Sequence, residues 1–411
     1  MEPIVERGCG LDVHQKTVVA CVLTGGAEQR AKKEVRTFGT TLSDLVELRG
    51  WLMDKAVTHV GMESTGVYWK PVYAVLEDAA LELIVGNAFH IKNVPGRKTD
   101  VRDAEWIADL VRHGLIAKSF VPPKPIRELR DLMRYYTKLV NARSGERNRL
   151  LKLLETANIK LSSVATDAFG KSGMAMLKAI VDGEDSGEML AELAQGLLKK
   201  KKPALRKALD GRVSEHHRFM LRMQLDRLNR LEEDLRKLDA YIEEKMTPYR
   251  VHQSLLEEIP GVGTHTARAI IAEIGVDMSV FKTEQRLAAW AGVCPGNNES
   301  AGKRFSGRTR KGNVYLRSAL VEASMSAARK KGSYLRSKYY RLKARTGVKR
   351  AAMAVAHKIL IVAFRILSDG TVYEDLGDGY LDTLRKTRTT HQLVRRLETL
   401  GFKVELTPAA A

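Results

Sequence analysis

Short apolar segments alternate with amphipathic ones over the first 120 residues. Five short apolar segments predict strands, at 8–15, 17–24, 34–40, 58–64 and 81–87. Three longer segments repeat their apolar residues at intervals of three and four, which predicts helices over 41–56, 65–79 and 99–114. This order of strands and helices is typical of a mixed α/β domain.

The pattern changes after the proline-rich segment at 122–125. Residues 126–160 and 213–246 are long, basic and amphipathic, and a smaller helical segment lies between them. Two long helices joined by a helical insert predict an antiparallel coiled-coil arm. The predicted domains are therefore an α/β domain, a helical arm, a mostly α C-terminal domain and a short tail, over 1–122, 123–250, 251–368 and 369–411.

Positive charge is concentrated in one part of the chain. The chain carries 69 Lys and Arg against 49 Asp and Glu, a net charge of +20. Residues 301–350 alone hold sixteen Lys or Arg and one acid, together with five aromatic residues. A basic segment with interleaved aromatic side chains indicates a nucleic-acid partner.

Composition argues against several other classes of protein. No run of 18 apolar residues occurs, so we expect no membrane span. The N-terminus lacks the charged and apolar regions of a secretion signal. Three scattered cysteines predict neither disulfides nor a cysteine metal site, which favours a reducing, cytoplasmic setting.

Four acids in the α/β domain form a candidate metal site. Asp12 and Glu63 end predicted strands, and Asp100 and Asp103 lie three residues apart at a helix start. Carboxylates in such positions supply the oxygen ligands that Mg²⁺ prefers, and two ions can stabilise both oxygens of a phosphodiester exchange. Alternatively, Asp100 and Asp103 complement the helix dipole and Asp12 caps a turn. His14 is either a substrate contact or a surface histidine.

A glycine-containing turn at 260–263 is a second candidate site. The flanking sequence over 256–275 predicts two helices, which is the helix-hairpin-helix pattern. Gly261 and Gly263 would let backbone amides approach a phosphate. An ordinary corner between two helices is the alternative.

The polar, glycine-rich segment at 294–317 is the third candidate. It carries Ser300 and Ser306, and a serine that attacks DNA needs an exposed position with cations over the phosphate. A serine in a loop commonly has no such role. Six basic residues are candidate phosphate ligands: Lys303, Arg304, Arg308, Arg310, Lys311 and Arg317.

Taken together, these motifs resemble the DEDD-type insertion-sequence transposases, the family of bridge-RNA-guided serine recombinases. The resemblance runs through GLDVHQKTVVACVL, GMESTGVYWKPV and KTDVRDAEWIADLVRHG, and then through IPGVGTHTARAIIAEIG, LAAWAGVCPGNNESAGK and RKGNVYLRSAL. It is close to full length, and the motifs occur in the family's order.

The resemblance implies an RNase-H-like (RuvC-like) N-terminal domain, a coiled-coil arm and a helical domain bearing a nucleophilic serine. That serine would be Ser300, with Ser306 as the competitor. The resemblance also implies Mg²⁺, or Mn²⁺ as a substitute, bound by Asp12, Glu63, Asp100 and Asp103.

The implied partners are double-stranded donor and target DNA, and a structured non-coding guide RNA. Homodimers would assemble into a tetramer in the bacterial or archaeal cytoplasm, with the acids of one protomer beside the serine of another. Two other functions stay open. A Mg²⁺-dependent junction resolvase would need the acids but no serine, and a non-enzymatic nucleic-acid-binding protein would need neither.

Overall fold

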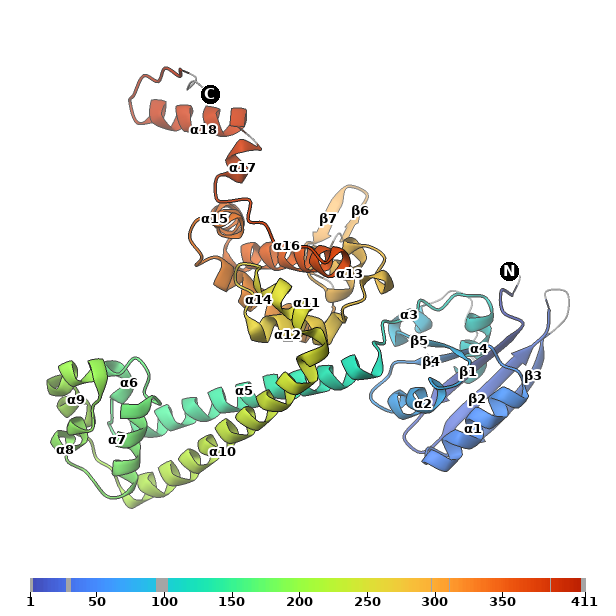
Figure 1. The fold of residues 1–411 in the computed structure, drawn as a ribbon, viewed down its shortest axis with the longest axis horizontal. Helices are drawn as coiled ribbons and strands as arrows, with labels where there is room; N and C mark the ends of the chain where they lie inside the picture. Colours follow the sequence, from blue (N-terminus) through green and yellow to red (C-terminus); the bar gives the residue numbers. More distant parts are fainter. Residues whose placement is uncertain are drawn as a thin grey trace. The chain divides into compact units, whose positions relative to one another are not determined.

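The computed structural model describes residues 3–26, 31–93, 103–296, 298–309, 311–384 and 386–407. The chain divides into two compact units, Met1–Val121 and Pro122–Ala411 (Figure 1). The first unit contains a sheet covered by helices, and the second is mostly helical. The α/β and mostly helical parts predicted from the sequence are therefore present.

A five-stranded mixed sheet forms the centre of the first unit. Its strands are β1 (Arg7–Val13), β2 (Val18–Thr24), β3 (Lys32–Phe38), β4 (His59–Glu63) and β5 (Glu82–Gly86). Their order is β3-β2-β1-β4-β5. β2 is antiparallel to both β1 and β3, whereas β4 is parallel to both β1 and β5. All five predicted strands are confirmed, each within two residues of its predicted bounds.

Helices cover both faces of this sheet (Figure 1). They are α1 (Leu42–Asp54), α2 (Trp69–Leu76), α3 (Ala88–Lys92) and α4 (Asp103–Arg112). On one face, Leu48 of α1 and Leu76 of α2 pack into the main apolar cluster of the sheet. On the other face, Ala104 and Ala108 of α4 pack against Cys21 of β2.

Glycines in β1 and β4 allow α4 to approach the sheet closely. A Cβ atom on Gly10 would lie 2.1 Å from the carbonyl oxygen of Ala104, and one on Gly61 would lie 2.3 Å from Val111. The start of α4 therefore lies over Gly10, whereas its end lies over Gly8. It follows that α4 runs opposite to β1, and its N-terminus points toward the carboxyl-terminal end of that strand.

Replacing Gly10 with alanine should displace α4 from the sheet. We expect the free energy of unfolding to fall by about 1–3 kcal/mol, because the added methyl group overlaps backbone atoms of the helix. Gly50→Ala in α1 is the matched control, since an added Cβ there meets nothing within 4 Å. That control should be neutral or stabilising by up to about 1 kcal/mol. Chemical denaturation compares the variants, and equal stability would contradict the close packing.

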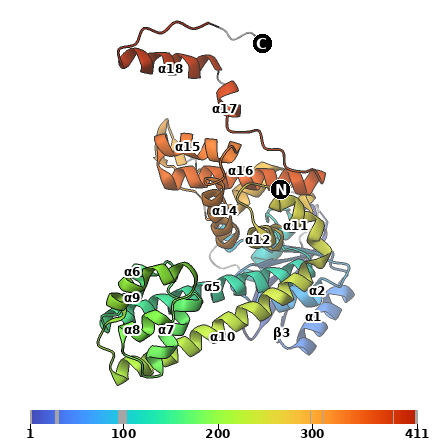
Figure 2. The same cartoon turned by 60° about the vertical axis from the view of Figure 1, so that its left-hand side comes forward.

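Two long helices, α5 (Lys124–Thr156) and α10 (Glu215–Met246), pair side by side in the second unit (Figure 2). Leu154, near the end of α5, belongs to the same apolar cluster as Leu221, near the start of α10, so the helices are antiparallel. Short helices close that end: α6 (Leu161–Val164), α7 (Lys171–Val181), α8 (Gly187–Glu192), η1 (Gly196–Lys201) and α9 (Lys202–Leu209). The two predicted long helices are confirmed, and coiled-coil geometry stays a prediction.

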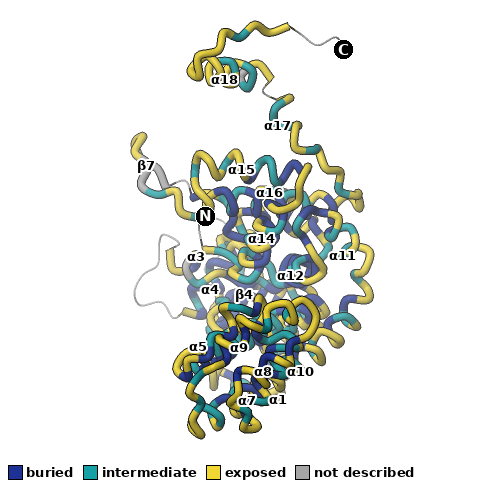
Figure 3. Tube along the Cα trace, turned by 90° about the vertical axis from the view of Figure 1, so that its left-hand side faces the viewer, coloured by how far each residue is buried: buried dark blue, intermediate teal, exposed yellow. Residues whose placement is uncertain are grey.

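The rest of the second unit is mostly helical, and its core is built around one apolar helix, α16 (Val348–Asp369). Its elements are η2 (Thr247–Tyr249), α11 (Arg250–Glu257), α12 (Thr264–Ile274), η3 (Met278–Val280), α13 (Glu284–Ala291), β6 (Asn298–Ser300), β7 (Lys303–Ser306), α14 (Val314–Ala327), α15 (Tyr334–Thr346), α16 (Val348–Asp369), α17 (Tyr380–Thr383) and α18 (Lys386–Thr399). The helix α16 packs against α13, α14 and α15, and much of it is buried (Figure 3). It is long and apolar enough to cross a membrane, but half of its apolar stretch is buried inside the unit, as expected of a core helix.

Candidate active site and nucleic-acid contacts

Asp12 and Glu63 occupy neighbouring positions at one edge of the sheet. β1 and β4 are parallel, with Leu11 paired to Met62, so the two acids stand at the next position along each strand. Both positions lie at the carboxyl-terminal ends of their strands. Because side chains alternate between the faces of a strand, both acids share the face that α4 covers.

Asp103 approaches the same edge from the helix layer. It is the first residue of α4, and the N-terminus of α4 points toward the carboxyl-terminal end of β1. The fourth predicted acid, Asp100, lies outside the described residues. Within the described part of the chain, no three His, Cys, Asp or Glu side chains are grouped closely enough to hold a metal ion. Three of the predicted acids thus share one edge without forming a closed set of ligands.

Two neighbouring side chains hold the strand-end acids. Nε2 of His14 lies 3.0 Å from Oδ2 of Asp12, and the hydroxyl of Thr65 donates a hydrogen bond to Glu63. The His14 side chain is 62% exposed, so it is a surface histidine that also contacts an acid. The predicted helix over 65–79 begins only at Trp69.

The donor set at this edge suits a hard divalent cation. Carboxylate oxygens are the ligands that Mg²⁺ and Mn²⁺ prefer. The Asp12 side chain is 27% exposed, so an ion can reach it from solvent. By residue type and by position on the sheet, Asp12, Glu63 and Asp103 fit a divalent metal.

The turn between α11 and α12 is shaped by packing. Gly261 has a φ of +88°, and a Cβ atom there would lie 2.3 Å from the carbonyl oxygen of Ala323 in α14. This contact explains why Gly261 must be glycine. Gly263 is the N-cap of α12, and a Cβ atom on it would meet nothing within 4 Å. The predicted phosphate contact at this turn stays a prediction, and the open side of Gly263 is where it would occur.

The polar, glycine-rich segment at 294–317 contains a two-stranded hairpin. Strands β6 and β7 are antiparallel, with Ser300 paired to Lys303 across a tight turn. Ala301 and Gly302 both have positive φ angles, 49° and 74°, as hairpin turns of two residues require. Ser300 is thus the last residue of β6, directly before the turn. Its side chain lies outside the described part of the structure.

The competitor, Ser306, has a local structural role. Its hydroxyl accepts a hydrogen bond from the backbone amide of Arg308 at 3.2 Å, which stabilises the end of β7. Gly296, before the hairpin, is packed as well, because a Cβ atom there would lie 2.1 Å from the carbonyl oxygen of Arg308. Both ends of the hairpin are therefore tied together, and the turn beside Ser300 is its distal end.

Most of the predicted phosphate ligands that the structure describes are exposed. Lys303, Arg308 and Lys311 are exposed, and Arg317 is half-buried on α14. Arg310 lies outside the described residues, and the side chain of Arg304 does as well. Lys303 lies in β7, and Arg308 and Lys311 follow the hairpin in sequence, which suits contact with a phosphate backbone.

Removing the exposed cations should flatten the salt dependence of DNA binding. Each phosphate contact that a cation makes contributes about 0.9 to the slope of log affinity against log salt. Changing Lys303, Arg308 and Lys311 together to alanine should reduce that slope by about one per residue lost from the interface. Fluorescence anisotropy at several salt concentrations measures it. The control changes three exposed lysines of the helical cluster: Lys171, Lys178 and Lys207. An equal effect in the control would place the binding surface elsewhere.

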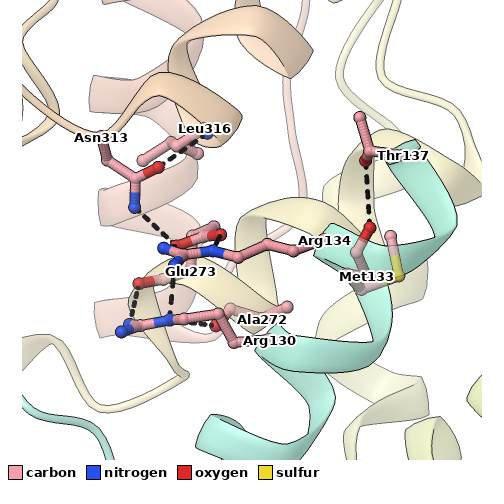
Figure 4. A network of polar contacts seen from close by, with 8 residues as sticks. All are labelled: Arg130, Met133, Arg134, Thr137, Ala272, Glu273, Asn313 and Leu316. Atoms are coloured by element: carbon pink, nitrogen blue, oxygen red, sulfur yellow. Dashed lines mark hydrogen bonds and ion pairs between the residues drawn. The ribbon is translucent and has the colours of Figure 1, made fainter. Parts of the chain in front are cut away.

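A buried ionic cluster that sequence reasoning missed lies beneath the start of α14 (Figure 4). Glu273 of α12 is only 2% exposed, and both of its oxygens accept hydrogen bonds from Arg134 of α5, at 2.7 and 2.8 Å. Arg130 donates to the carbonyl oxygens of Ala272 and Glu273, at 3.2 and 2.6 Å. Asn313 donates to Glu273 at 2.5 Å and also caps α14. One carboxylate thus joins α5, α12 and the segment that follows the serine hairpin.

Burial and the Glu273 charge act in opposite directions on the two arginines. Burial lowers the pKa of Arg130 to about 10, and the attraction of Glu273 offsets only part of this. Burial also disfavours the charged form of Arg134, but the hydrogen bonds and charge of Glu273 raise the pKa of that guanidinium above its usual value. Both side chains stay positive at neutral pH, so the cluster depends on Glu273 as their shared counter-charge.

Two family models match the chain. Residues 9–159 match a DEDD-type model described as "Transposase", and residues 253–341 match "Transposase IS116/IS110/IS902 family". The first match contains Asp12, Glu63, Asp100 and Asp103, and the second contains Ser300. Together they cover more than half of the chain.

Two relatives named as transposases support the same assignment, and a third is a protein of an insertion element. The transposase for insertion sequence element IS1111A of Coxiella burnetii is 25% identical over 69% of this chain and 71% of its own length. A putative transposase of Sinorhizobium fredii, y4pF/y4sB, is 28% identical over 70% of this chain and 66% of its own. The uncharacterized 42 kDa protein of insertion element IS900 from Mycobacterium paratuberculosis is 32% identical over 35% of this chain and 36% of its own. The protein therefore belongs to the DEDD-type family of insertion-sequence transposases, which are DNA-processing enzymes.

Proposed function

We propose that the protein cuts and rejoins DNA strands, with a metal-binding set of acids in the first unit and Ser300 of the second unit as nucleophile. One observation supports the acid half of this proposal: Asp12 and Glu63 stand at adjacent positions of parallel strands, on the sheet face that α4 covers. The strand order β3-β2-β1-β4-β5 is compatible with an RNase-H-like domain, in which strand-end acids act on phosphodiesters.

The metal-binding residues would be Asp12, Glu63, Asp100 and Asp103. A divalent ion held by them would supply positive charge to the phosphate and to the attacking and leaving oxygens. The carboxylates position that charge, and the exposed cations near the hairpin hold the DNA backbone. No catalytic histidine is required by this arrangement.

Ser300 would form the covalent link to DNA. Its hydroxyl oxygen attacks the phosphorus atom, and the bond from phosphorus to the 3′ oxygen breaks. The serine proton is lost, and the leaving 3′ oxygen takes up a proton, so a phosphoserine and a free 3′-hydroxyl result. Attack on the phosphoserine by a different 3′-hydroxyl then reseals a strand without net hydrolysis.

The acids and Ser300 lie on different units of the chain. We propose that one protomer supplies the acids and a second protomer the serine, within dimers that pair into tetramers. A structured guide RNA, held by the basic surface of the second unit, would select donor and target DNA by base pairing. The high positive charge of residues 301–350 supports binding to a nucleic acid.

A covalent trapping experiment tests the serine assignment. A nicked suicide DNA substrate, incubated with Mg²⁺, should give a protein–DNA adduct that survives denaturation. The adduct should be absent in Ser300→Ala and retained in Ser306→Ala. An adduct that is lost in Ser306→Ala and retained in Ser300→Ala would assign the nucleophile to Ser306. Continued cleavage by Ser300→Ala without any adduct would favour a Mg²⁺-dependent junction resolvase.

A further inference from the structure

The helix α15 carries a basic and aromatic surface of its own. It holds five Lys or Arg and no acid over thirteen residues. Tyr339 is buried, whereas 48% of the surface of Tyr340 is exposed. The guanidinium of Arg336 lies 5.2 Å from the centre of the Tyr340 ring, and the ammonium of Lys343 lies 5.5 Å from it. An exposed aromatic ring flanked by cations is the kind of platform on which unpaired bases stack.

Tyr340 also lines a pocket of about 480 Å³, here named the Tyr340 pocket. Its lining residues come from α15 and from the segment around α17: Arg336, Ser337, Tyr340, Arg341, Asp378, Gly379 and Asp382. It is a hollow open to solvent over much of its surface rather than an enclosed cavity. Its volume is large enough for a single nucleobase, one face of which would stay exposed.

The segment around α17 is fastened to α15 by specific contacts. The backbone amide of Tyr334 donates to Oδ1 of Asp375 at 2.8 Å, and Arg341 forms an ion pair with Asp382. The rings of Tyr334 and Tyr380 meet edge to face, 5.9 Å apart. Both sides of the pocket are thus built by the fold of the second unit.

Among the charged groups of the pocket, Asp378 offers an acceptor to a base, whereas Arg336 and Arg341 are donors and Asp382 is paired with Arg341. The carboxylates of Asp378 and Asp382 accept hydrogen bonds and donate none when ionised. Guanine presents two adjacent donors, its N1–H and its amino group, which one carboxylate can accept together. Thymine and uracil present a single N–H on that edge.

We propose that the Tyr340 pocket binds one unpaired guanine nucleotide of a DNA or RNA strand, with the base stacked on Tyr340 and its donor edge on Asp378. The flexible side chains of Arg336 and Lys343 contact the flanking phosphates. A base within a duplex is stacked and paired, so it cannot enter the pocket. This inference goes beyond the proposed strand exchange and does not depend on Ser300 or the acids.

Binding of short labelled oligonucleotides to the full-length protein tests the proposal. Fluorescence anisotropy compares thymine or uracil strands that contain one central guanine with the same strands lacking it, as DNA and as RNA, and with a duplex. Tyr340→Ala should weaken binding of the guanine strand about tenfold or more, and duplex binding should not change. Tyr340→Phe should retain binding. Asp378→Asn should remove the preference for guanine.

Tyr241→Ala is the matched control, because Tyr241 is 45% exposed and has Lys245 5.1 Å from its ring, but it does not line the pocket. Binding is measured without added divalent metal, so no strand exchange contributes and this site is separated from the proposed chemistry. A Tyr340-dependent loss with DNA, RNA or both supports the pocket and identifies the strand. The proposal is overturned by an equal loss in Tyr241→Ala, by an equal loss on duplex, or by no loss in either strand.

Discussion

Replacing Glu63 with glutamine should reduce metal-dependent DNA cleavage by at least about 100-fold. Changes to residues that only support metal ligands already cost about 10–100-fold in affinity or activity, so removing a ligand charge should cost more. Glutamine keeps the size of the side chain and can still accept a hydrogen bond from Thr65. The fold should therefore be unchanged, and the loss should be one of metal binding.

Initial cleavage rates on a plasmid with element ends measure this effect, and Mn²⁺ titration by calorimetry measures binding directly. Asp12→Asn should behave in the same way, since Asp12 stands beside Glu63 on the neighbouring strand. Glu47→Gln is the control, because Glu47 is an exposed acid of α1 that pairs with Arg36. If Glu63→Gln cleaved DNA at the unmodified rate, the metal assignment would be wrong.

Replacing Glu273 with alanine should destabilise the second unit by about 3–5 kcal/mol. Removing one partner of a buried ion pair leaves an uncompensated charge, and here two partly buried arginines lose the same counter-charge. Asn313 loses an acceptor as well, which loosens the start of α14. Chemical denaturation followed by far-ultraviolet circular dichroism measures the change, since this unit is mostly helical.

Glu284→Ala is the matched control for Glu273→Ala. Glu284 also receives two hydrogen bonds from one arginine, Arg365, at 2.7 and 3.0 Å. The Arg365 side chain is 61% exposed, so this pair is at the surface and its loss should cost about 1 kcal/mol or less. A similar cost for both variants would contradict the special role of the buried cluster.

The strands and long helices were predictable because each has a local hydrophobic period. The edge position of Asp12 and Glu63 was predictable too, since both acids directly follow apolar segments. The ionic cluster was not, because Glu273 and Arg134 are 139 residues apart in the sequence and meet only when α5 packs on α12. Its signal in the sequence is an acid in the apolar second half of α12.

Glycines were the least decisive positions to interpret from the sequence. A glycine that allows a phosphate to approach and one that allows a helix to approach look the same in a single sequence. The structure gives Gly261 a packing role against α14. The hairpin around Ser300 was also missed, because its strands are short and polar, and only Ala301 and Gly302 mark its turn.

The central claim is that the acids of one protomer act with Ser300 of another, and subunit mixing tests it most directly. Asp12→Asn and Ser300→Ala, each alone, should form no adduct with a nicked suicide substrate. Co-expressed as mixed assemblies with distinguishable tags, they should restore a covalent adduct carried only by the Asp12→Asn protomer, which retains its serine. Absence of adduct from assemblies shown to contain both protomers, or an adduct on the Ser300→Ala protomer, would contradict the claim.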